Sequence, residues 1–252
     1  MIRLIEIETS AFTQFCAHDA LGARILATLR SYTGLTGSDA AQCWAQEIND
    51  QPIAVISLID GFATLYANES ADWDELAIFL QMQSCLHLQC DAQIARHLPL
   101  EEAWRSQVLR FNAPARAPLI GVEIIRANDP SEIFELLESN FASVKNRELW
   151  MADMALRWRR GTARSWLLRR EGVNHSTASA MALAENHAYL GAVATLPEMR
   201  GQGLAGELLA RVAEQQKAEG REAILSCLPE LAGFYQSVGF ETAGEWVMLK
   251  LE

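Results

Sequence analysis

The chain has 252 residues, of which 50% are hydrophobic and 21% are charged, and its formal net charge is −11 at pH 7. This composition is typical of a globular protein of one or two domains and excludes a disordered chain. The negative charge argues against general nucleic-acid binding and against binding to anionic membrane surfaces, because both need basic patches.

No apolar run approaches the roughly 20 residues that a membrane-spanning helix needs. Residues 1–8 alternate like a strand and include acids where a signal peptide would be apolar. We therefore expect a cytoplasmic protein with no membrane partner. An odd number of cysteines does not suit a secreted disulfide framework, so we expect reduced thiols at Cys16, Cys43, Cys85, Cys90 and Cys227.

The first half of the chain alternates helix and strand signals. In order, these predict a helix over 13–30, a hairpin of strands 44–47 and 52–59, a strand over 62–67, a helix over 72–85, and strand and turn near 88–92. Residues 111–118 contain Pro114 and Pro118 among small residues and are the best linker candidate. We place a domain boundary near residue 115.

The second half repeats this rhythm. It predicts a strand over 118–126, a helix from Asp129-Pro130 toward Asn140, a helix over 148–160 ended by Gly161, and a hairpin of strands 163–170 and 177–184. These are followed by a buried strand over 189–195, a helix over 203–219, a strand over 223–227, a short helix over 229–238, and one or two strands over 240–251. Helix, hairpin, strand, helix and strand follow one another in both halves, which favours an α/β fold with a mixed sheet and an internal duplication.

A glycine-rich turn joins the strand over 189–195 to the helix that starts near Gly203. Glycine lets the backbone turn sharply, and the first amides of a helix lack internal partners and favour an anion such as phosphate. Arg200 would add a positive charge. The spacing of Gly201, Gly203 and Gly206 also matches the dinucleotide fingerprint. However, that motif needs its first glycine at the strand end and several further βα units, which this sequence lacks.

Arg200-x-x-Gly203-x-Ala205, which follows Val193-Ala194-Thr195, resembles the coenzyme A loop of the GNAT superfamily of acyl-CoA-dependent N-acetyltransferases. Downstream, Phe234-Tyr235-x-x-x-Gly239-Phe240 resembles that family's Tyr-x-x-x-Gly-Phe motif. The resemblance covers about residues 118–252 and implies a GNAT-like fold. It also implies acetyl-CoA as cosubstrate, no metal, and an amine of a small molecule or a peptide as acceptor.

The resemblance also implies roles for individual residues. The pantetheine arm would pair with the backbone of the strand, and the diphosphate would lie on the amides of residues 202–206. Tyr235 would be the general acid that protonates the leaving thiolate, since tyrosine has a reference pKa of about 10. The general base is left open among Glu171, Glu185, His187 and a water relay. The expected cofactor-binding residues are Val193, Ala194, Thr195, Arg200, Gly201, Gln202, Gly203, Leu204, Ala205 and Gly206.

Two departures from the family pattern matter. Leu228 stands where the family often has Asn, which puts one contact in doubt. In the first half, the corresponding loop over residues 68–75 has no glycine and no base but several acids, which repel a diphosphate. We therefore expect residues 1–115 to be a degenerate GNAT-like domain that has lost coenzyme A and covers the acceptor cleft or sets acceptor specificity. Residues 116–252 would be the acetyltransferase domain.

Several other patterns have both a functional and an ordinary interpretation. Cys85-x-His87-x-x-Cys90 suggests metal, but no fourth ligand is near and buried thiols are normally apolar core residues. The tryptophans at 150, 158 and 166 suit core packing better than an acceptor pocket. For the whole chain, the alternatives to an N-acetyltransferase are a non-catalytic acyl-CoA sensor and a structural domain without coenzyme A. The oligomeric state is open.

Overall fold

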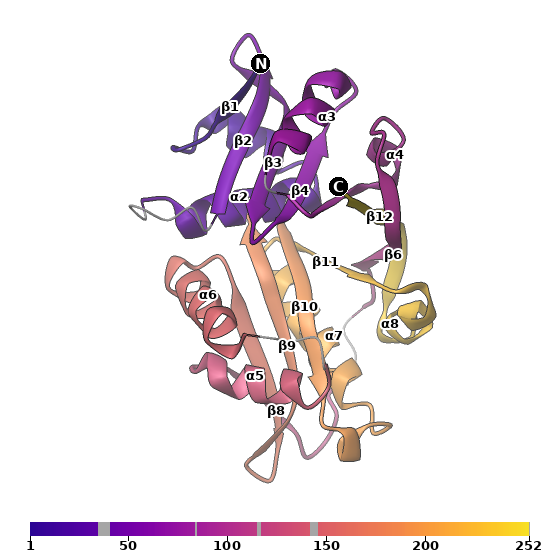
Figure 1. The fold of residues 1–252 in the computed structure, drawn as a ribbon. Helices are drawn as coiled ribbons and strands as arrows, with labels where there is room; N and C mark the ends of the chain where they lie inside the picture. Colours follow the sequence, from indigo (N-terminus) through magenta and orange to yellow (C-terminus); the bar gives the residue numbers. More distant parts are fainter. Residues whose placement is uncertain (35–40, 84, 115–116, 142–145, 252) are drawn as a thin grey trace. The chain divides into compact units, whose positions relative to one another are not determined.

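The computed structural model describes residues 1–34, 41–83, 85–114, 117–141 and 146–251. The chain divides into two compact units (Figure 1). Unit 1 comprises residues 1–108, 227–229 and 243–252, and unit 2 comprises residues 109–226 and 230–242. The strand β6 (Glu101–Phe111) begins in unit 1 and ends in unit 2, whereas β12 (Phe240–Lys250) does the reverse.

Unit 1 is a mixed sheet with helices packed on it. Its remaining elements are β1 (Ile2–Leu4), α1 (Ser10–Cys16), α2 (Ala20–Tyr32), β2 (Ala41–Ile48), β3 (Gln51–Ile59), β4 (Phe62–Ala67), α3 (Trp73–Met82), β5 (His87–Asp91) and α4 (Ala92–Ala95). The strand order is β1-β2-β3-β4-β5-β12-β6, and β4 and β5 are parallel. Helices α1 and α2 pack on β2–β4. The apolar residues of α3, including Leu76 and Leu80, pack into a core with β4, β5 and β12.

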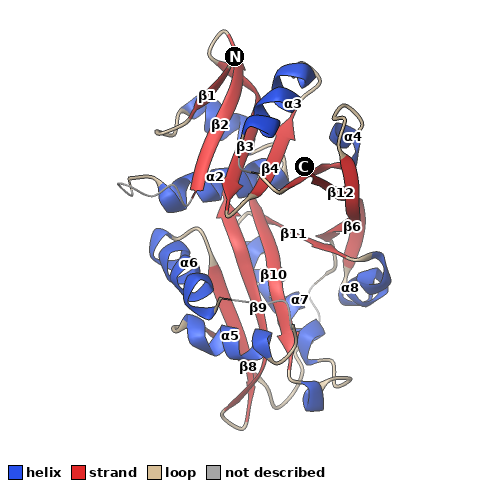
Figure 2. Ribbon diagram, viewed as in Figure 1, coloured by secondary structure: helices blue, strands red, loops and turns tan. Residues whose placement is uncertain are grey.

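Unit 2 has the same kind of sheet, with helices on both faces. Its elements are β7 (Glu123–Arg126), α5 (Pro130–Glu138), α6 (Arg147–Arg160), β8 (Arg164–Arg170), β9 (Val173–Ala184), β10 (His187–Thr195), the 3₁₀ turn η1 (Pro197–Met199), α7 (Leu204–Ala218), β11 (Glu222–Cys227), η2 (Pro229–Leu231) and α8 (Ala232–Val238). The strand order is β6-β11-β10-β9-β8-β7, and β10 and β11 are parallel. Figure 2 shows α5 and α6 in front of β8–β10 and α7 behind them.

The element order confirms the expected internal duplication. Each half of the chain runs through a strand, two helices, an antiparallel hairpin and a third strand, followed by a helix, a parallel strand, a short helix and a closing strand. The expected boundary at residues 115 and 116 falls outside the described residues. Contacts assign residues 243–252 to unit 1, where β12 pairs with β5 from Trp246 to Lys250. The functional division into residues 1–115 and 116–252 stays a prediction.

Two expectations about elements are wrong. The helix expected over 13–30 is two helices, because the Asp19 carboxylate accepts the amide of Leu21 at 2.7 Å and starts α2 anew. The strand β6 was not expected at all, since the alternation of its exposed and buried residues is interrupted by Trp104 and Arg105. The hairpin expected from strands 44–47 and 52–59 is confirmed, and Asn49 and Asp50 in its turn both have positive φ.

Candidate active site in unit 2

The parallel strands β10 and β11 pair over a short stretch and then part. They are in register at three positions, from His187 opposite Glu222 to Tyr189 opposite Ile224. Both strands are fully described, and no pair follows, although β10 continues to Thr195. Strands that diverge leave backbone N–H and C=O groups on their facing edges, and such groups need partners. A ligand with amide groups can supply them, as an added strand does.

A β-bulge lies on β10 in this open region. Gly191 is opposite Ser179 and Ala194 is opposite Thr177, so two residues of β10 face one residue of β9. These two residues are Ala192 and Val193, and Ala192 has φ of 49°, an unusual conformation for a residue other than glycine. Bulges bend a strand and re-aim its backbone groups, and they are frequent beside binding sites. The bulge includes Val193, the first residue of the segment Val193, Ala194 and Thr195 where the pantetheine arm was expected.

Thr195 and its neighbours are fixed from the β9 side. The Ser176 hydroxyl donates to the Ala194 carbonyl at 2.8 Å and lies 2.9 Å from the Thr195 hydroxyl. The Leu196 amide donates to the His175 carbonyl at 2.9 Å. These bonds hold the end of β10 in place up to the turn that precedes α7.

The turn between β10 and α7 presents an open helix start. Gly201 and Gly203 have φ of 76° and 75°, the left-handed region in which glycine is favoured. Gly203 is the N-cap of α7, and no side chain among the described residues caps this helix. A Cβ added at either glycine would meet nothing within 4 Å. Open space therefore lies beside both glycines of this turn, and the helix dipole favours an anion at the uncapped start of α7.

The helices of the first half show the contrast. Each of the helices α1 to α4 has a side chain that accepts a backbone amide at its start. These side chains are, in chain order, those of Thr9, Asp19, Asp72 and Asp91. For α3, which follows β4 as α7 follows β10, the Asp72 carboxylate accepts the Glu75 amide at 3.0 Å. The equivalent anion position in unit 1 is thus filled by the protein's own carboxylate.

Two guanidinium groups lie at the α7 turn. Arg200 is exposed and donates to the Asn140 side chain, just after α5. Arg170, at the end of β8, donates to the Gln202 side chain at 2.8 Å. Arg200 was predicted from the sequence, whereas Arg170 and Asn140 were not. Only the packing of the β8–β9 hairpin and of α5 brings Arg170 and Asn140 to this turn.

Tyr235 lies on α8, half-buried, with its ring 5.0 Å from that of Phe234 and 6.2 Å from that of Phe240. Leu231, Phe234 and Val238 have the i, i+3, i+7 spacing of one helix face, but they do not form a single buried stripe. Leu231 is 47% exposed and Phe234 is 41% exposed, whereas Val238 is buried. The helix is short and turns away at Gly239, so its i, i+3, i+7 face does not lie wholly against the core.

The motif residues Gly239 and Phe240 have clear structural reasons. Gly239 has φ of 115°, and a Cβ added there would lie 2.3 Å from the Cβ of Ala113. Phe240 is buried and meets the Phe111 ring edge-on at 5.3 Å. Glycine is therefore required where α8 ends, and Phe240 anchors the start of β12 in the core of unit 2.

The strand opening has a second phenol that the sequence did not indicate. The Tyr189 hydroxyl lies 2.9 Å from the Ser226 hydroxyl, across β10 and β11, and Tyr189 is the last paired residue before the strands part. The base candidates Glu185 and His187 lie at the other end of β10. His187 is 3.6 Å from the Glu222 carboxylate, where the strands are paired. Neither is therefore placed at the open region.

The other sequence patterns yield no further site. His87 and Cys90 are three residues apart on β5, so their side chains point to opposite faces and do not share a metal. Among the described residues, no group of three or more candidate metal ligands occurs. All five cysteines are free and buried. Within the described part of the chain, no helix has the length and apolar character to cross a membrane.

Comparisons with known proteins agree with this geometry. Residues 161–242 match the family model described as the GNAT acetyltransferase domain. A search of curated proteins found no match. An acetyltransferase of the GNAT family from Colwellia psychrerythraea is 15% identical with a TM-score of 0.59, over 100% of both chains.

Two further structures are similar over nearly the whole chain. A GCN5-related N-acetyltransferase from Sphaerobacter thermophilus is 17% identical with a TM-score of 0.60, over 99% of this chain and 94% of that one. A tandem GNAT protein from the clavulanic acid biosynthesis pathway is 12% identical with a TM-score of 0.62, over 99% and 98%. The chain has the fold of these GNAT proteins, the tandem one included, and its residues 161–242 match the model of the GNAT acetyltransferase domain.

Proposed function

We propose that unit 2 is an N-acetyltransferase that transfers an acetyl group from acetyl-CoA to an amine of a small molecule or a peptide. The observation that carries the proposal is the start of α7, which has a glycine N-cap, no side-chain cap among the described residues, and open space above Gly201 and Gly203. It follows the strand β10 at the point where β10 and β11 have parted. The family match over residues 161–242 supports the same assignment.

The proposed binding residues follow from this arrangement. The diphosphate is held at the turn formed by Arg200, Gly201, Gln202 and Gly203 and at the first turn of α7, Leu204, Ala205 and Gly206. Arg200 and Arg170 supply positive charge at its edge. The pantetheine arm pairs with the backbone of Val193, Ala194 and Thr195 beside the bulge. Acetyl-CoA supplies the thioester, and small residues keep the turn accessible.

The proposed reaction needs two proton movements. A neutral amine attacks the thioester carbonyl, the new C–N bond forms, and the C–S bond breaks. Backbone N–H groups beside the bulge on β10 stabilise the negative charge that develops on the carbonyl oxygen. Tyr235 donates its proton to the leaving thiolate, and the amine proton leaves through water or a base of the acceptor site. We propose the general-acid role for Tyr235 rather than Tyr189, because the former lies on the helix that carries the family motif.

The test is acetyl transfer by the purified full chain, with acetyl-CoA and a panel of amines, amino acids, aminoglycosides and peptides. Tyr235→Phe is expected to lower kcat by about 100-fold or more while the acetyl-CoA Kd stays within about twofold. Tyr32→Phe, which removes a phenol from unit 1, is the matched control, and Tyr189→Phe tests the rival acid. Binding of acetyl-CoA without turnover on any amine would favour the sensor alternative, and no binding would refute the proposal.

A further inference from the structure

A cavity of about 630 Å³ opens within unit 1, at the carboxyl ends of β4 and β5. These parallel strands pair at three positions, from Phe62 opposite His87 to Thr64 opposite Gln89, and β4 then continues to Ala67 without a further pair in the described structure. Ligands of α/β sheets bind in crevices at such strand ends, and the volume lies in the range of small-molecule pockets. The position corresponds to the open strand end of unit 2.

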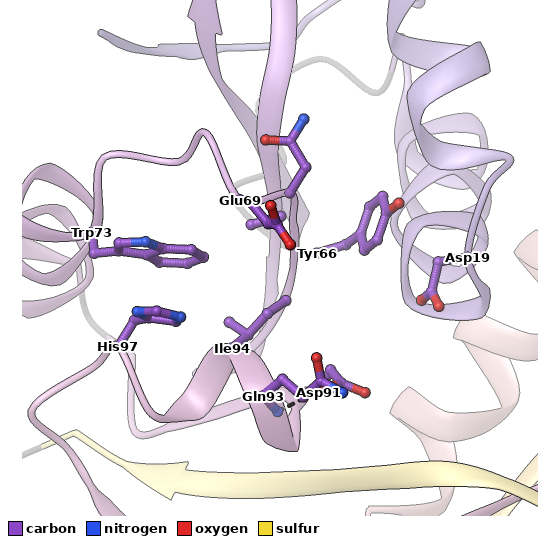
Figure 3. A pocket seen from close by; sticks show the side chains of 10 residues that line it. Asp19, Tyr66, Glu69, Trp73, Asp91, Gln93, Ile94 and His97 are labelled. Carbon is purple, nitrogen blue, oxygen red and sulfur yellow. Dashed lines mark hydrogen bonds between the residues drawn. The ribbon is translucent and has the colours of Figure 1, made fainter.

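The walls of this cavity are partly aromatic. Figure 3 shows the rings of Trp73 and His97 parallel to each other on one side and Tyr66 on the other, with Ile94 between them. The Trp73 and His97 rings are 4.5 Å apart and 9° from parallel. Ile94 is buried, whereas Tyr66 and Trp73 are half-buried. Such walls suit a ligand with an apolar body, and aromatic faces attract cations.

The charged groups in the lining are acidic. The carboxylates are those of Asp19, Glu69 and Asp91, and none of the lining residues is lysine or arginine. Asp19 and Asp91 each accept one helix amide, at 2.7 Å, so their positions are fixed by the starts of α2 and α4. Burial raises the pKa of Tyr66, and the nearby Asp19 charge raises it further.

The charge of the cavity excludes the ligand expected in unit 2. At the start of α3 the Asp72 carboxylate already occupies the anion position, and Asp74 and Glu75 follow in the first turn. Residues 1–115 contain 14 of the 32 acidic side chains but only 6 of the 21 basic ones. A diphosphate would be repelled, whereas an ammonium group would meet carboxylates and aromatic faces together.

We propose that this unit 1 cavity, lined by Tyr66, Trp73 and the carboxylates of Asp19, Glu69 and Asp91, binds a small organic cation, an amine with an apolar body. The site is separate from the proposed coenzyme A site and does not depend on acetyl transfer. The duplicated fold then uses the same strand opening for opposite charges, an anion in unit 2 and a cation in unit 1.

The test is calorimetric titration of the full chain without acetyl-CoA, using phenethylammonium as the probe. Its neutral isostere 2-phenylethanol and the anion 3-phenylpropionate are the comparison ligands. We expect a Kd of about 1 mM or tighter for the ammonium, which is reasonable for a ligand of its size. The alcohol should bind at least about tenfold more weakly and the anion should not bind measurably.

Asp91→Asn removes one carboxylate while keeping an oxygen that caps α4, so the fold is retained. It is expected to weaken phenethylammonium binding about fivefold. Asp129→Asn is the matched control, because Asp129 caps α5 in unit 2 through a similar bond of 2.9 Å to the Ser131 amide. The proposal is overturned if phenethylammonium does not bind, if the three ligands bind equally, or if the two variants change binding to the same extent.

Discussion

Substituting the N-cap of α7 with two residues of the same shape and different charge tests how the proposed diphosphate site works. Gly203 has φ of 75° and ψ of 6°, and is exposed. An ordinary residue in this conformation costs about 1–2 kcal/mol, but Asn and Asp tolerate it better than others. Gly203→Asn and Gly203→Asp therefore carry similar strain, and their difference isolates the charge.

The size of that difference follows from simple electrostatics. Two unit charges 4 Å apart interact by about 1 kcal/mol in water and by about 4 kcal/mol at an effective dielectric constant of about 20. Because the turn is exposed, the lower figure applies, and two charged phosphate groups bring the penalty to about 2 kcal/mol. Gly203→Asp should therefore bind coenzyme A about 30-fold more weakly than Gly203→Asn.

The assay is isothermal titration of coenzyme A at two ionic strengths, with thermal unfolding to confirm that both variants fold. Screening shortens the reach of exposed charges to about 8 Å at physiological salt and less above it. The ratio of the two Kd values should therefore shrink as salt is added. Equal affinities for the Asp and Asn variants at low salt would refute a diphosphate at the start of α7.

Three further predictions concern stability. Gly239→Ala should lower the free energy of unfolding by more than about 2 kcal/mol, because its Cβ would meet another Cβ at 2.3 Å. Gly244→Ala is the control, because a Cβ added there meets nothing within 4 Å, and it should change the free energy of unfolding little. Urea unfolding measures both variants, and similar losses of stability would contradict a steric requirement for Gly239. Asp72→Ala should lose about 1 kcal/mol with the α3 cap whereas Asp72→Asn should not, and equal urea midpoints for the two would show that the cap contributes nothing. Finally, the hydrogen bond from Arg30 lowers the pKa of Glu8 in the folded protein. The Glu8–Arg30 pair therefore stabilises the fold fully above the unfolded-state pKa of about 4.3. This contribution is lost as the pH falls through the lower folded-state pKa. The difference in urea midpoint between wild type and Glu8→Gln should be present at pH 7 and shrink progressively as the pH falls below about 4; a difference independent of pH would contradict this assignment.

The elements around the α7 turn were predictable because their signals are local. A buried strand, two glycines and an amphipathic helix follow one another within residues 189–219, and each constrains the backbone by itself. The same holds for Gly161, which ends α6 with φ of 73°. Capping, glycine conformation and periodicity act over a few residues, and the sequence displays them directly.

The features that the sequence did not predict depend on contacts between segments that are distant in the chain. Buried and exposed residues do not alternate cleanly along β6. Its two neighbours in the sheet are β12 and β11, which lie far away in the chain. The Ser106 hydroxyl of β6 donates to the Trp246 carbonyl of β12 at 3.3 Å. Arg170 reaches the α7 turn only because of the β8–β9 register. The unit 1 cavity draws its residues from α2, β4, β5 and the segments that follow these strands, and no local pattern joins them.

The most direct test of the account is nuclear magnetic resonance of the full chain during titration with coenzyme A. We expect the backbone amide signals of Gly203, Leu204 and Ala205 to shift with the added ligand. The amides at the start of α3, Trp73 to Glu75, should stay unchanged, because Asp72 already occupies that helix end. If the α7 amides do not move, or if the α3 amides move with them, the proposed coenzyme A site is wrong.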